Sequence, residues 1–516
     1  MGSKAFIVIL FTLTLILPPP CDASIVRESM KFTMTDDTVI DGAYYFPEDA
    51  HNHPNHPAII LATSWLMSKY EYEMQARKLA KRGYIVLNYS ARGFGRSGGK
   101  VRIASEDDIG DVSTLIDHLQ NKFDTDKIGI AGISYGGGIG LLASAFDKRI
   151  RAVACLSGWT DLNATLYRGK TVNRTWSFFL MRSGQVFGRI HPETLSIYHN
   201  LINRENIDWT IKWAANRSAN NYMEAFHQNQ PAIYISSNIN DNLFDPGHNL
   251  KFYHAYQGPK TMDINKGIHA SAELMGLAGI SNYVWTRLHK HFDFHLKGEG
   301  EPLVSTHMVD NTNKREAFTV EKNKLQKTLF LSKVAGKLLL APTKSQESTW
   351  IPYSAKKDTT ATTGLPLIGT LKSAHLNGTY ANLSRVNPRY GLVFQGAPVE
   401  QTMKIRGTPK IQLKVKAEQA PLLVITYLYD VPKRGKSRLI AHGPQTVWKN
   451  NPNQTYTVDI ELFNSNYDLP KGHSIAVVVD SRDPLYQPIR QDETIQIGVG
   501  PHLSSITIPH LENQTL

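Results

Sequence analysis

The pentapeptide GISYG at residues 132–136 is the feature that most restricts how this chain can fold. An apolar, β-branched run leads into it at 127–133, and a run of small residues follows it at 138–145. This order predicts a strand, a sharp turn and a helix, with Ser134 at the turn. Glycines on both sides of the serine fit such a turn, because a Cβ there would collide with the neighbouring strand or helix. The same five residues also occur in passive turns, so the rest of the chain must supply a base, an acid and oxyanion donors.

The composition is that of an ordinary globular protein. The chain has 516 residues, of which 41% are apolar and 20% charged, which allows two or three domains with ample cores. The formal net charge of +12 comes from scattered lysines and arginines, without a basic stripe interleaved with aromatic residues. We therefore expect no nucleic-acid partner, and we interpret the charge as that of a basic exported protein attracted to acidic surfaces.

Residues 1–23 have the pattern of a secretory signal peptide. A basic start with Lys4 precedes an apolar run at 5–17, and the segment ends with small residues at Ala23. The run is too short to span a bilayer comfortably, so we expect a secreted or periplasmic protein with no membrane span after the signal is removed. Cys155 is then the one cysteine left, since Cys21 lies in the signal. Cys155 falls in an apolar run that predicts a buried strand, and no intrachain disulfide is expected.

Residues 24–300 predict an α/β domain. After an antiparallel hairpin within 24–60, short apolar segments alternate with helical patterns, which is typical of a parallel sheet covered on both faces. The predicted strands are 58–62, 84–89, 127–133, 152–156, 232–236 and 261–264, with helices over 70–82 and 108–123. The alternation is interrupted at about 161–229 by a helical stretch rich in aromatic residues and arginine, which we interpret as a cap over the carboxyl edge of the sheet.

Residues 301–516 predict an all-β domain. Short strands separated by Gly, Pro and Asn are typical of a sandwich of the jelly-roll kind. The strands expected from the pattern are 326–331, 336–340, 390–394, 410–416, 422–430, 455–462, 473–479 and 493–497.

A serine nucleophile requires a base that accepts its proton and an acid that orients the base. In the α/β-hydrolase order, the acid and the histidine follow the serine, each after a strand. Asp241 follows the strand at 232–236, and His269 follows the strand at 261–264. Asp245 is an alternative acid, although Pro246 after it suits a helix cap better.

The oxyanion donors are expected to be backbone amides. One is the N–H of Tyr135, directly after the nucleophile, and the other belongs to the loop after the strand at 58–62, at or near Trp65. This chemistry needs no cofactor, and we predict no metal site: the histidine-rich segment at 51–57 carries prolines and lacks partner ligands.

Several motifs together resemble one group of α/β-hydrolases. The elbow GISYGG at 132–137, the loop RGFGRSGG at 92–99 and the acid motif NDNLF at 240–244 are similar to those of X-prolyl dipeptidyl-peptidases, cocaine esterase and α-amino-acid ester hydrolases. The last part is similar to their C-terminal β-domain at YGLVF 390–394, IRGTP 405–409, LYDV 428–431 and LPKGH 469–473. The resemblance runs in order along nearly the whole mature chain. One difference is that relatives commonly have His-Gly where this chain has Thr63-Ser64-Trp65.

The resemblance and the triad pattern imply an exported serine hydrolase that acts on a carboxylic ester or an amide through an acyl-enzyme. We favour an ester, because the cap has few carboxylates to anchor the free amino group of an X-prolyl substrate. The alternatives are an X-prolyl dipeptidyl-peptidase or a related serine peptidase, and a non-catalytic exported protein that binds through its β-domain. The expected partner is a small ester or a short peptide, while the oligomeric state remains open.

Overall fold

The structure of the protein is a computed structural model. It describes residues 25–51, 56–318, 324–343, 345–346, 348–364, 378–417, 421–448, 451, 454–489, 493–500 and 503–511. The predicted signal peptide, residues 1–23, lies outside the described residues. Within the part that the structure describes, the helices are too short or too polar to cross a bilayer.

A ten-stranded sheet forms the centre of the N-terminal part, in the order β1-β2-β4-β3-β5-β6-β7-β8-β9-β10. The strands from β4 to β9 are parallel, while β1, β2 and β10 pair antiparallel at the two edges, which confirms the predicted hairpin and parallel core. The strands are β1 (Ile25–Thr33), β2 (Val39–Pro47), β3 (Ala58–Ala62), β4 (Ile85–Tyr89), β5 (Ile128–Ile133), β6 (Ile150–Leu156), β7 (Ala232–Asn238), β8 (Lys260–Asn265), β9 (His307–Val309) and β10 (Arg315–Ala317).

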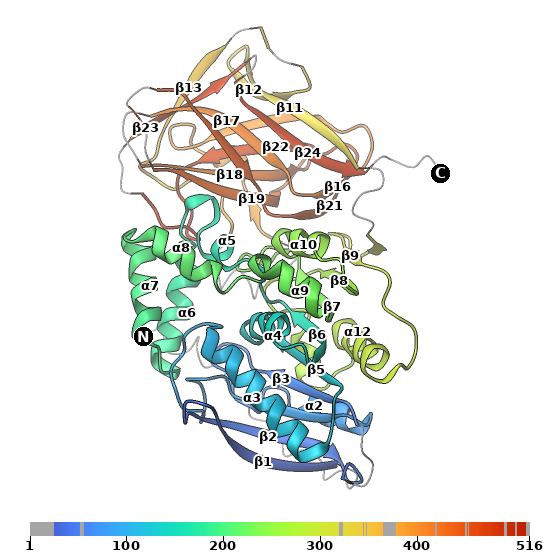
Figure 1. The fold of residues 1–516 in the computed structure, drawn as a ribbon. Coiled ribbons are helices and arrows are strands. Elements are labelled where there is room, and N and C mark those ends of the chain that lie inside the picture. The colour runs from blue at the N-terminus through green and yellow to red at the C-terminus, as the bar shows by residue number, and fades with distance from the viewer. Residues whose placement is uncertain are drawn as a thin grey trace.

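Helices cover both faces of this sheet (Figure 1). They are α2 (Glu73–Lys81), α3 (Glu106–Phe123), α4 (Tyr135–Phe146), α10 (Pro246–Ala255), α11 (Leu274–Leu277) and α12 (Tyr283–Phe292), with a π-helical turn η4 (Asp293–Lys297) after α12. Alternate residues of β3 show the two faces: Ile60 packs in the core with α3 and α4, whereas Ile59 and Leu61 pack with α2 and α12. This period of two explains why the parallel strands have continuous apolar sequences.

The interruption predicted at 161–229 is helical. It contains α5 (Leu162–Leu166), η2 (Arg168–Lys170), α6 (Arg174–Phe187), α7 (Pro192–Asn203), α8 (Ile207–Ala215), η3 (Ala219–Tyr222) and α9 (Met223–Asn229). We refer to residues 161–229 as the cap. It lies between β6 and β7 in the chain, and its helices α5 and α8 lie beside the C-terminal β-domain in Figure 1.

The C-terminal part is an all-β sandwich, as predicted. Its strands are β11 (Lys324–Val334), β12 (Lys337–Ala341), β13 (Thr349–Ser354), β14 (Tyr380–Ala381), β15 (Leu392–Pro398), β16 (Met403–Gly407), β17 (Lys410–Ala417), β18 (Leu422–Val431), β19 (Ser437–Val447), β20 (Tyr456–Glu461), β21 (Ser465–Leu469), β22 (Ser474–Asp480), β23 (Thr494–Val499) and β24 (Ser505–Leu511), with a 3-10 turn η5 (Leu383–Arg385). Apolar residues from these strands, including Leu413, Val477 and Ile506, form its core.

Two features of this part differ from the sequence analysis. Strands β9 and β10 follow the domain boundary expected at residue 300, yet they extend the sheet of the N-terminal part, and the second sheet begins only with β11. The structure also contains strands that the pattern did not predict, namely β13, β14, β16, β19, β21 and β24. The longest of them, β19, contains Gly443 and Pro444 and forms by pairing with β18.

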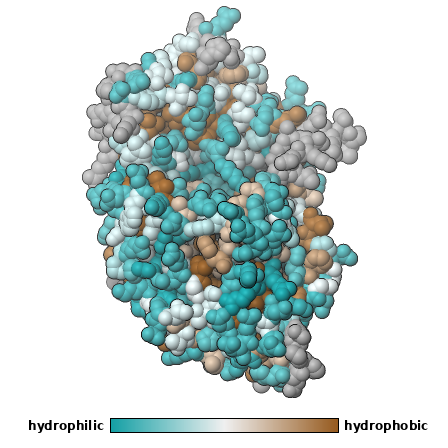
Figure 2. Space-filling view, viewed as in Figure 1, coloured by the Kyte–Doolittle hydropathy of each residue, from teal (hydrophilic) through white to brown (hydrophobic). Residues whose placement is uncertain are grey.

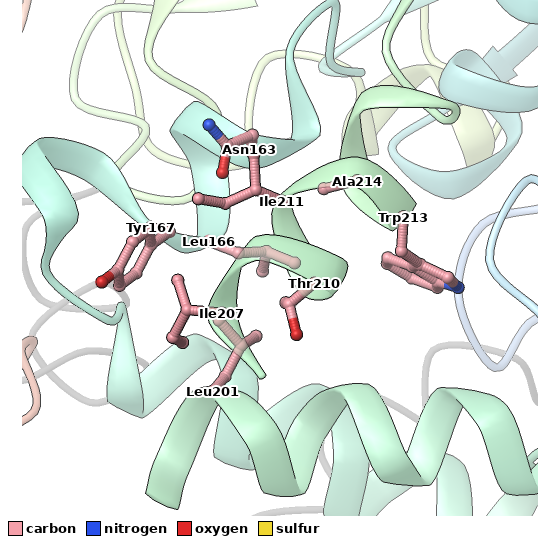
Figure 3. A pocket seen from close by; sticks show the side chains of 9 residues that line it. All are labelled: Asn163, Leu166, Tyr167, Leu201, Ile207, Thr210, Ile211, Trp213 and Ala214. Atoms are coloured by element: carbon pink, nitrogen blue, oxygen red, sulfur yellow. The ribbon is translucent and has the colours of Figure 1, made fainter. Parts of the chain in front are cut away.

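The face of the molecule seen in Figure 2 is mainly hydrophilic, with apolar residues in separate patches. A small apolar cavity lies inside the cap, between α5, α7 and α8 (Figure 3). Its volume is about 10 Å³, close to the space of a single water molecule. Side chains from all three helices surround it, so the cap has its own core with one packing gap.

The cavity makes the cap sensitive to loss of a lining side chain. Leu201 is 3% exposed and borders the cavity, so Leu201→Ala enlarges a gap that already exists. We expect this variant to lose about 2–5 kcal/mol of stability, measured by urea unfolding monitored through tryptophan fluorescence. The control is Phe178→Ala on α6, where the side chain is 53% exposed and a change within about 0.5 kcal/mol is expected. Equal losses for the two variants would contradict this account of the cap core.

Candidate active site

Ser134 lies in a strained turn between β5 and α4. Its backbone has φ 55° and ψ −111°, a conformation that residues with a side chain rarely adopt. The turn packs so tightly against β3 that a Cβ on Gly136 would lie 1.9 Å from the carbonyl oxygen of Ala62. A Cβ on Gly132 would lie 2.4 Å from the carbonyl carbon of Gly136. The glycines of the motif are therefore required by this close approach, as the sequence indicated.

The structure brings Ser134, His269 and Asp241 into one chain of hydrogen bonds. His269 Nε2 lies 2.9 Å from Ser134 Oγ, and His269 Nδ1 lies 2.8 Å from Asp241 Oδ2. The three residues follow the carboxyl ends of β5, β7 and β8. These strands are parallel, and they lie in the order β5-β6-β7-β8 in the sheet, so their carboxyl ends are at the same edge. In this arrangement the imidazole can accept the serine proton at Nε2 while the carboxylate holds Nδ1–H.

The carboxylate of Asp241 is held in place by groups other than the histidine. Its side chain is buried, and Oδ1 accepts hydrogen bonds of 2.9 Å from the backbone N–H groups of Leu243 and Phe244. Oδ2 is left for His269. These two N–H donors fix the carboxylate orientation, so the geometry does not depend on the histidine alone.

Asp245, the alternative acid, has a different role. It caps α10 by accepting from the N–H of Gly247, and it pairs with Arg168 at 2.6 Å. Burial alone would raise the pKa of Asp245, but the charges of Arg168 and His248 outweigh it and hold that pKa below its ordinary value. Asp245 also accepts from the N–H of Asn464 in the β-domain, so it joins the two halves of the chain.

Aromatic rings from two different segments enclose His269. Trp176 of the cap meets the imidazole edge-on with a centroid separation of 5.6 Å, and Phe244 does so at 5.1 Å. The indole N–H of Trp176 donates to Asn242 Oδ1 at 2.8 Å, directly beside Asp241. Asn173, which caps α6, donates to the carbonyl of Asn242 at 3.1 Å. The sequence placed Trp176 among the aromatic residues of the cap, but it gave no signal for these contacts.

The two expected oxyanion donors lie on either side of the elbow. Tyr135 is the first residue of α4, so its N–H has no partner within the helix. Between residues 56 and 318, where every position is described, the Trp65 N–H meets no backbone acceptor. The Trp65 ring packs edge-on against Tyr135 at 5.4 Å and against Phe94 at 4.9 Å.

A buried glutamate that sequence reasoning missed holds this loop. One carboxylate oxygen of Glu71 accepts from the N–H of Ser64 at 2.7 Å, and the other lies 2.5 Å from Ser64 Oγ. Ser64 Oγ also lies 3.0 Å from the carbonyl of Ile133, the residue before the serine of the elbow. Burial raises the pKa of Glu71 to about 7, against the smaller opposing effect of the Ser64 hydrogen bonds.

A second buried glutamate lies beneath the histidine loop. Glu273 accepts hydrogen bonds from Ser157 and Ser236 at 3.1 and 2.9 Å and from Asn238 at 3.2 Å. Burial raises its pKa, and these three donors partly counter the shift. The network joins the ends of β6 and β7 to the segment that follows His269.

Cys155 is fully buried in β6, as predicted, and burial raises the pKa of its thiol to about 12, which suits a core residue. Across the described residues, no three or more histidine, cysteine, aspartate or glutamate side chains are grouped to hold a metal ion.

Two family models match the chain. Residues 36–271 match the X-Pro dipeptidyl-peptidase (S15 family) model, and residues 299–512 match the X-Pro dipeptidyl-peptidase C-terminal non-catalytic domain. Among curated proteins, uncharacterized protein PA2218 of Pseudomonas aeruginosa is 26% identical over 155 residues, which are 29% of this chain and 41% of that protein. Protein YcjY of Escherichia coli, also uncharacterized, is 29% identical over 138 residues, which are 25% of this chain and 45% of that protein. The chain thus spans less than half the length of these relatives.

Solved structures share the whole architecture. A CocE/NonD family hydrolase from Staphylococcus aureus superposes with a TM-score of 0.72 at 13% identity, over 94% of both chains. An aminopeptidase from a marine sediment Thaumarchaeota archaeon has a TM-score of 0.71 at 13% identity, covering 96% of this chain and 98% of its own. An α-amino acid ester hydrolase has a TM-score of 0.71 at 14% identity, over 97% and 98%. At these identities the likeness establishes the fold.

The raised pKa of Glu71 predicts a pH effect on stability. A carboxyl whose pKa rises from its ordinary 4.5 to about 7 on folding favours the folded state below about pH 4.5 and loses that contribution as the pH rises through about 7. The loss amounts to about 3 kcal/mol at 1.36 kcal/mol per pH unit. Glu71→Gln, which cannot ionise, should lack it, so the difference in unfolding free energy between the two proteins should shift in favour of the variant between about pH 5 and about pH 8.

This difference is measured by urea unfolding at several pH values. Glu224→Gln, at an exposed position on α9, is the matched control and should follow the wild-type curve. If Glu71→Gln kept the wild-type pH dependence, the protonation assigned to Glu71 would be wrong.

Proposed function

Because this chain belongs to the α/β-hydrolase group that contains X-prolyl dipeptidyl-peptidases, cocaine-esterase-like hydrolases and α-amino-acid ester hydrolases, we propose that Ser134, His269 and Asp241 are its catalytic triad and that it cleaves carboxylic esters. Membership makes it a serine hydrolase of the esterase or peptidase type. The observation that carries the proposal is the continuous chain of hydrogen bonds from Ser134 through His269 to Asp241, at 2.9 and 2.8 Å.

In the first half of the reaction, Ser134 Oγ attacks the carbonyl carbon of the ester while His269 Nε2 accepts the serine proton. Asp241 stabilises the imidazolium through Nδ1–H. The negative charge on the former carbonyl oxygen is bound by the N–H of Tyr135 and by that of Trp65. When the C–O bond to the leaving group breaks, His269 returns the proton to the departing alkoxide, and the acyl group stays on Ser134.

In the second half, a water molecule takes the place of the alcohol. His269 accepts a proton from the water as its oxygen attacks the acyl carbon, and the same two amides bind the new oxyanion. The bond between the acyl carbon and Ser134 Oγ then breaks, His269 gives the proton back to the serine, and the carboxylic acid leaves. The residues of the chain suffice for each of these proton transfers, so the proposed mechanism uses no cofactor.

The surroundings of the triad favour an ester substrate. The side chains that meet His269 are the rings of Trp176 and Phe244, which suit an uncharged acyl or alcohol group. The free amino group of a dipeptidyl substrate needs a carboxylate partner, but Asp245 is already paired with Arg168. The cap carboxylates Glu205, Asp208 and Glu224 are exposed.

An X-prolyl dipeptidyl-peptidase is the second candidate, because both matched family models carry that description. A non-catalytic binding protein is less consistent with the structure, because a vestigial site has no need to keep Ser134 in a strained conformation. We also propose that the protein is exported, on the sequence of residues 1–23.

The nucleophile is tested by Ser134→Ala. Removing Oγ leaves no atom to form the acyl-enzyme, so kcat on p-nitrophenyl acetate should fall by about 10⁴-fold or more, and covalent labelling by a fluorophosphonate should disappear. Persistent labelling of this variant would show that another residue is the nucleophile.

Two matched aspartate variants serve as controls for that experiment. Asp241→Asn should lower kcat by about 10⁴-fold because it disturbs the orientation and tautomer of His269. Asp245→Asn should chiefly lower stability, because it breaks the pair with Arg168. The opposite result would make Asp245 the acid.

The substrate class is tested by comparing short p-nitrophenyl esters with Ala-Pro-p-nitroanilide. We expect kcat/KM for the esters to exceed that for the anilide by about 10²-fold or more, since Asp245 is already paired with Arg168 and an unpaired α-amino charge is poorly tolerated. The measurement is initial rate at equal enzyme concentration, with Ser134→Ala as the background. A higher kcat/KM for the anilide would establish the peptidase instead.

A further inference from the structure

A cleft lies between α2 and α12, on the face of the sheet opposite to α3 and α4. Its volume is about 240 Å³, against about 10 Å³ for the gap inside the cap. The mechanism above does not use any of its lining side chains. It is much larger than the gap inside the cap, and its lining is polar and charged rather than apolar.

One wall of the cleft is basic. Lys78, Lys81 and Arg82 from the end of α2 line it, and none of the described residues that line the cleft is acidic. Lys78 donates to the carbonyl of Gly279 at 2.5 Å, and Arg82 pairs with Asp293, which lies outside the lining. The C-terminal end of α2 favours cations by itself. That preference explains the charges, but it does not explain an open cleft of this size beside them.

The opposite wall supplies hydrogen-bonding groups and an apolar surface. Ser281, Asn282 and Thr286 lie at the start of α12, where the helix dipole adds positive potential. Ile280, which is 50% exposed, provides most of the apolar part, and the buried Trp285 borders the cleft beside it. An anionic group can therefore lie against α2 while a carbon skeleton lies against α12.

The remaining polar side chains of the cleft are neutral. His289 Nε2 lies 3.2 Å from Gln75 Oε1, so the ring donates to the amide oxygen. Burial, aided by the charge of Arg82, lowers the pKa of His289 to about 4, so the imidazole is uncharged at neutral pH. Gln75 in turn donates to the carbonyl of Gly276. The positive charge of the lining thus comes from α2 alone.

We propose that this cleft is a binding site for a small organic phosphate or sulfate ester, whose tetrahedral anion is held by Lys78, Lys81 and Arg82. Three cations around one anionic group give charge-assisted hydrogen bonds, the strongest kind available to a solvent-accessible site. The volume exceeds what an inorganic anion fills, and the exposed side chain of Ile280 offers an apolar surface to the rest of the ligand. The site is separate from the proposed chemistry at Ser134.

The probe for the test is inorganic pyrophosphate, titrated into the full chain by isothermal calorimetry at constant ionic strength. Wild type should bind at one site and gain thermal stability. The double variant Lys78→Gln/Lys81→Gln should weaken binding by about tenfold or more, the effect of losing hydrogen bonds to charged groups. Lys290→Gln, exposed on α12 but outside the cleft, removes one of the same charges and should leave the Kd within about twofold.

Three further measurements make the result decisive. Lys81→Gln alone, at an exposed position, guards against a folding defect in the double variant, and it too should weaken binding.

Glucose 6-phosphate and glucose 6-sulfate should bind more tightly than free phosphate and free sulfate respectively, whereas glucose should not bind. Absence of pyrophosphate binding to wild type, or equal weakening by Lys290→Gln, would overturn the site. Esters no tighter than the free anions would overturn the assigned ligand class. Ser134→Ala should bind pyrophosphate like wild type, which separates this test from that of the proposed function.

Discussion

The close approach of the elbow to β3 is the constraint on which the rest of the site depends. Gly136 lies so near the carbonyl of Ala62 that no larger residue fits, and this contact fixes the start of α4 against the centre of the sheet. Ser134, in the turn before α4, adopts a positive φ, and this conformation places Oγ above the carboxyl ends of the strands. The strained backbone at Ser134 persists because the buried packing of β3, β5 and α4 around it holds the turn in place.

The loop after β7 connects the three parts of the molecule within a few residues. Asp241 binds His269, Asn242 receives hydrogen bonds from Trp176 and Asn173 of the cap, and Asp245 joins Arg168 to the β-domain. Arg168 in turn donates to the carbonyls of Glu461 and Leu462, at the end of β20 in the β-domain. The position of the acid, the closure of the cap and the docking of the sandwich are therefore not independent. This coupling gives the C-terminal domain a physical role beside the site, although none of its described residues hydrogen-bonds to Ser134 or His269.

The sequence predicted what depends on local pattern. The parallel strands are buried on both faces, so each has a continuous apolar run, and the two residues that follow β7 and β8 could be placed at the same edge as Ser134. Strand β19 could not be predicted, because Gly443 and Pro444 contradict a strand and only the ladder with β18 stabilises it. Strands β9 and β10 are likewise too short to show a pattern, and they form because β8 offers an open edge.

The contacts around the triad were beyond prediction for a related reason. Trp176 and Asn242 are far apart in the chain, and no periodicity says that an indole N–H will meet that amide. The Asp241–Asp245 choice was different, because Pro246 placed Asp245 at a helix start, and the structure shows it capping α10. Long-range contacts, both side-chain pairs and strand ladders such as that of β18 with β19, are thus the information that the sequence alone did not carry.

The loop at Thr63-Ser64-Trp65 departs from the His-Gly common in relatives. Its hydrogen bonds through Ser64 can be assigned from the number of protons that Ser64 and Glu71 carry. Ser64 Oγ has one hydrogen but lies within bonding distance of both Glu71, at 2.5 Å, and the carbonyl of Ile133, at 3.0 Å. Both contacts can be hydrogen bonds at once only if Glu71 is protonated and donates to Ser64, which then donates to Ile133. The raised pKa of Glu71 is what such a relay requires. The buried Glu71 thus ties this loop, through Ser64, to the strand carrying Ser134.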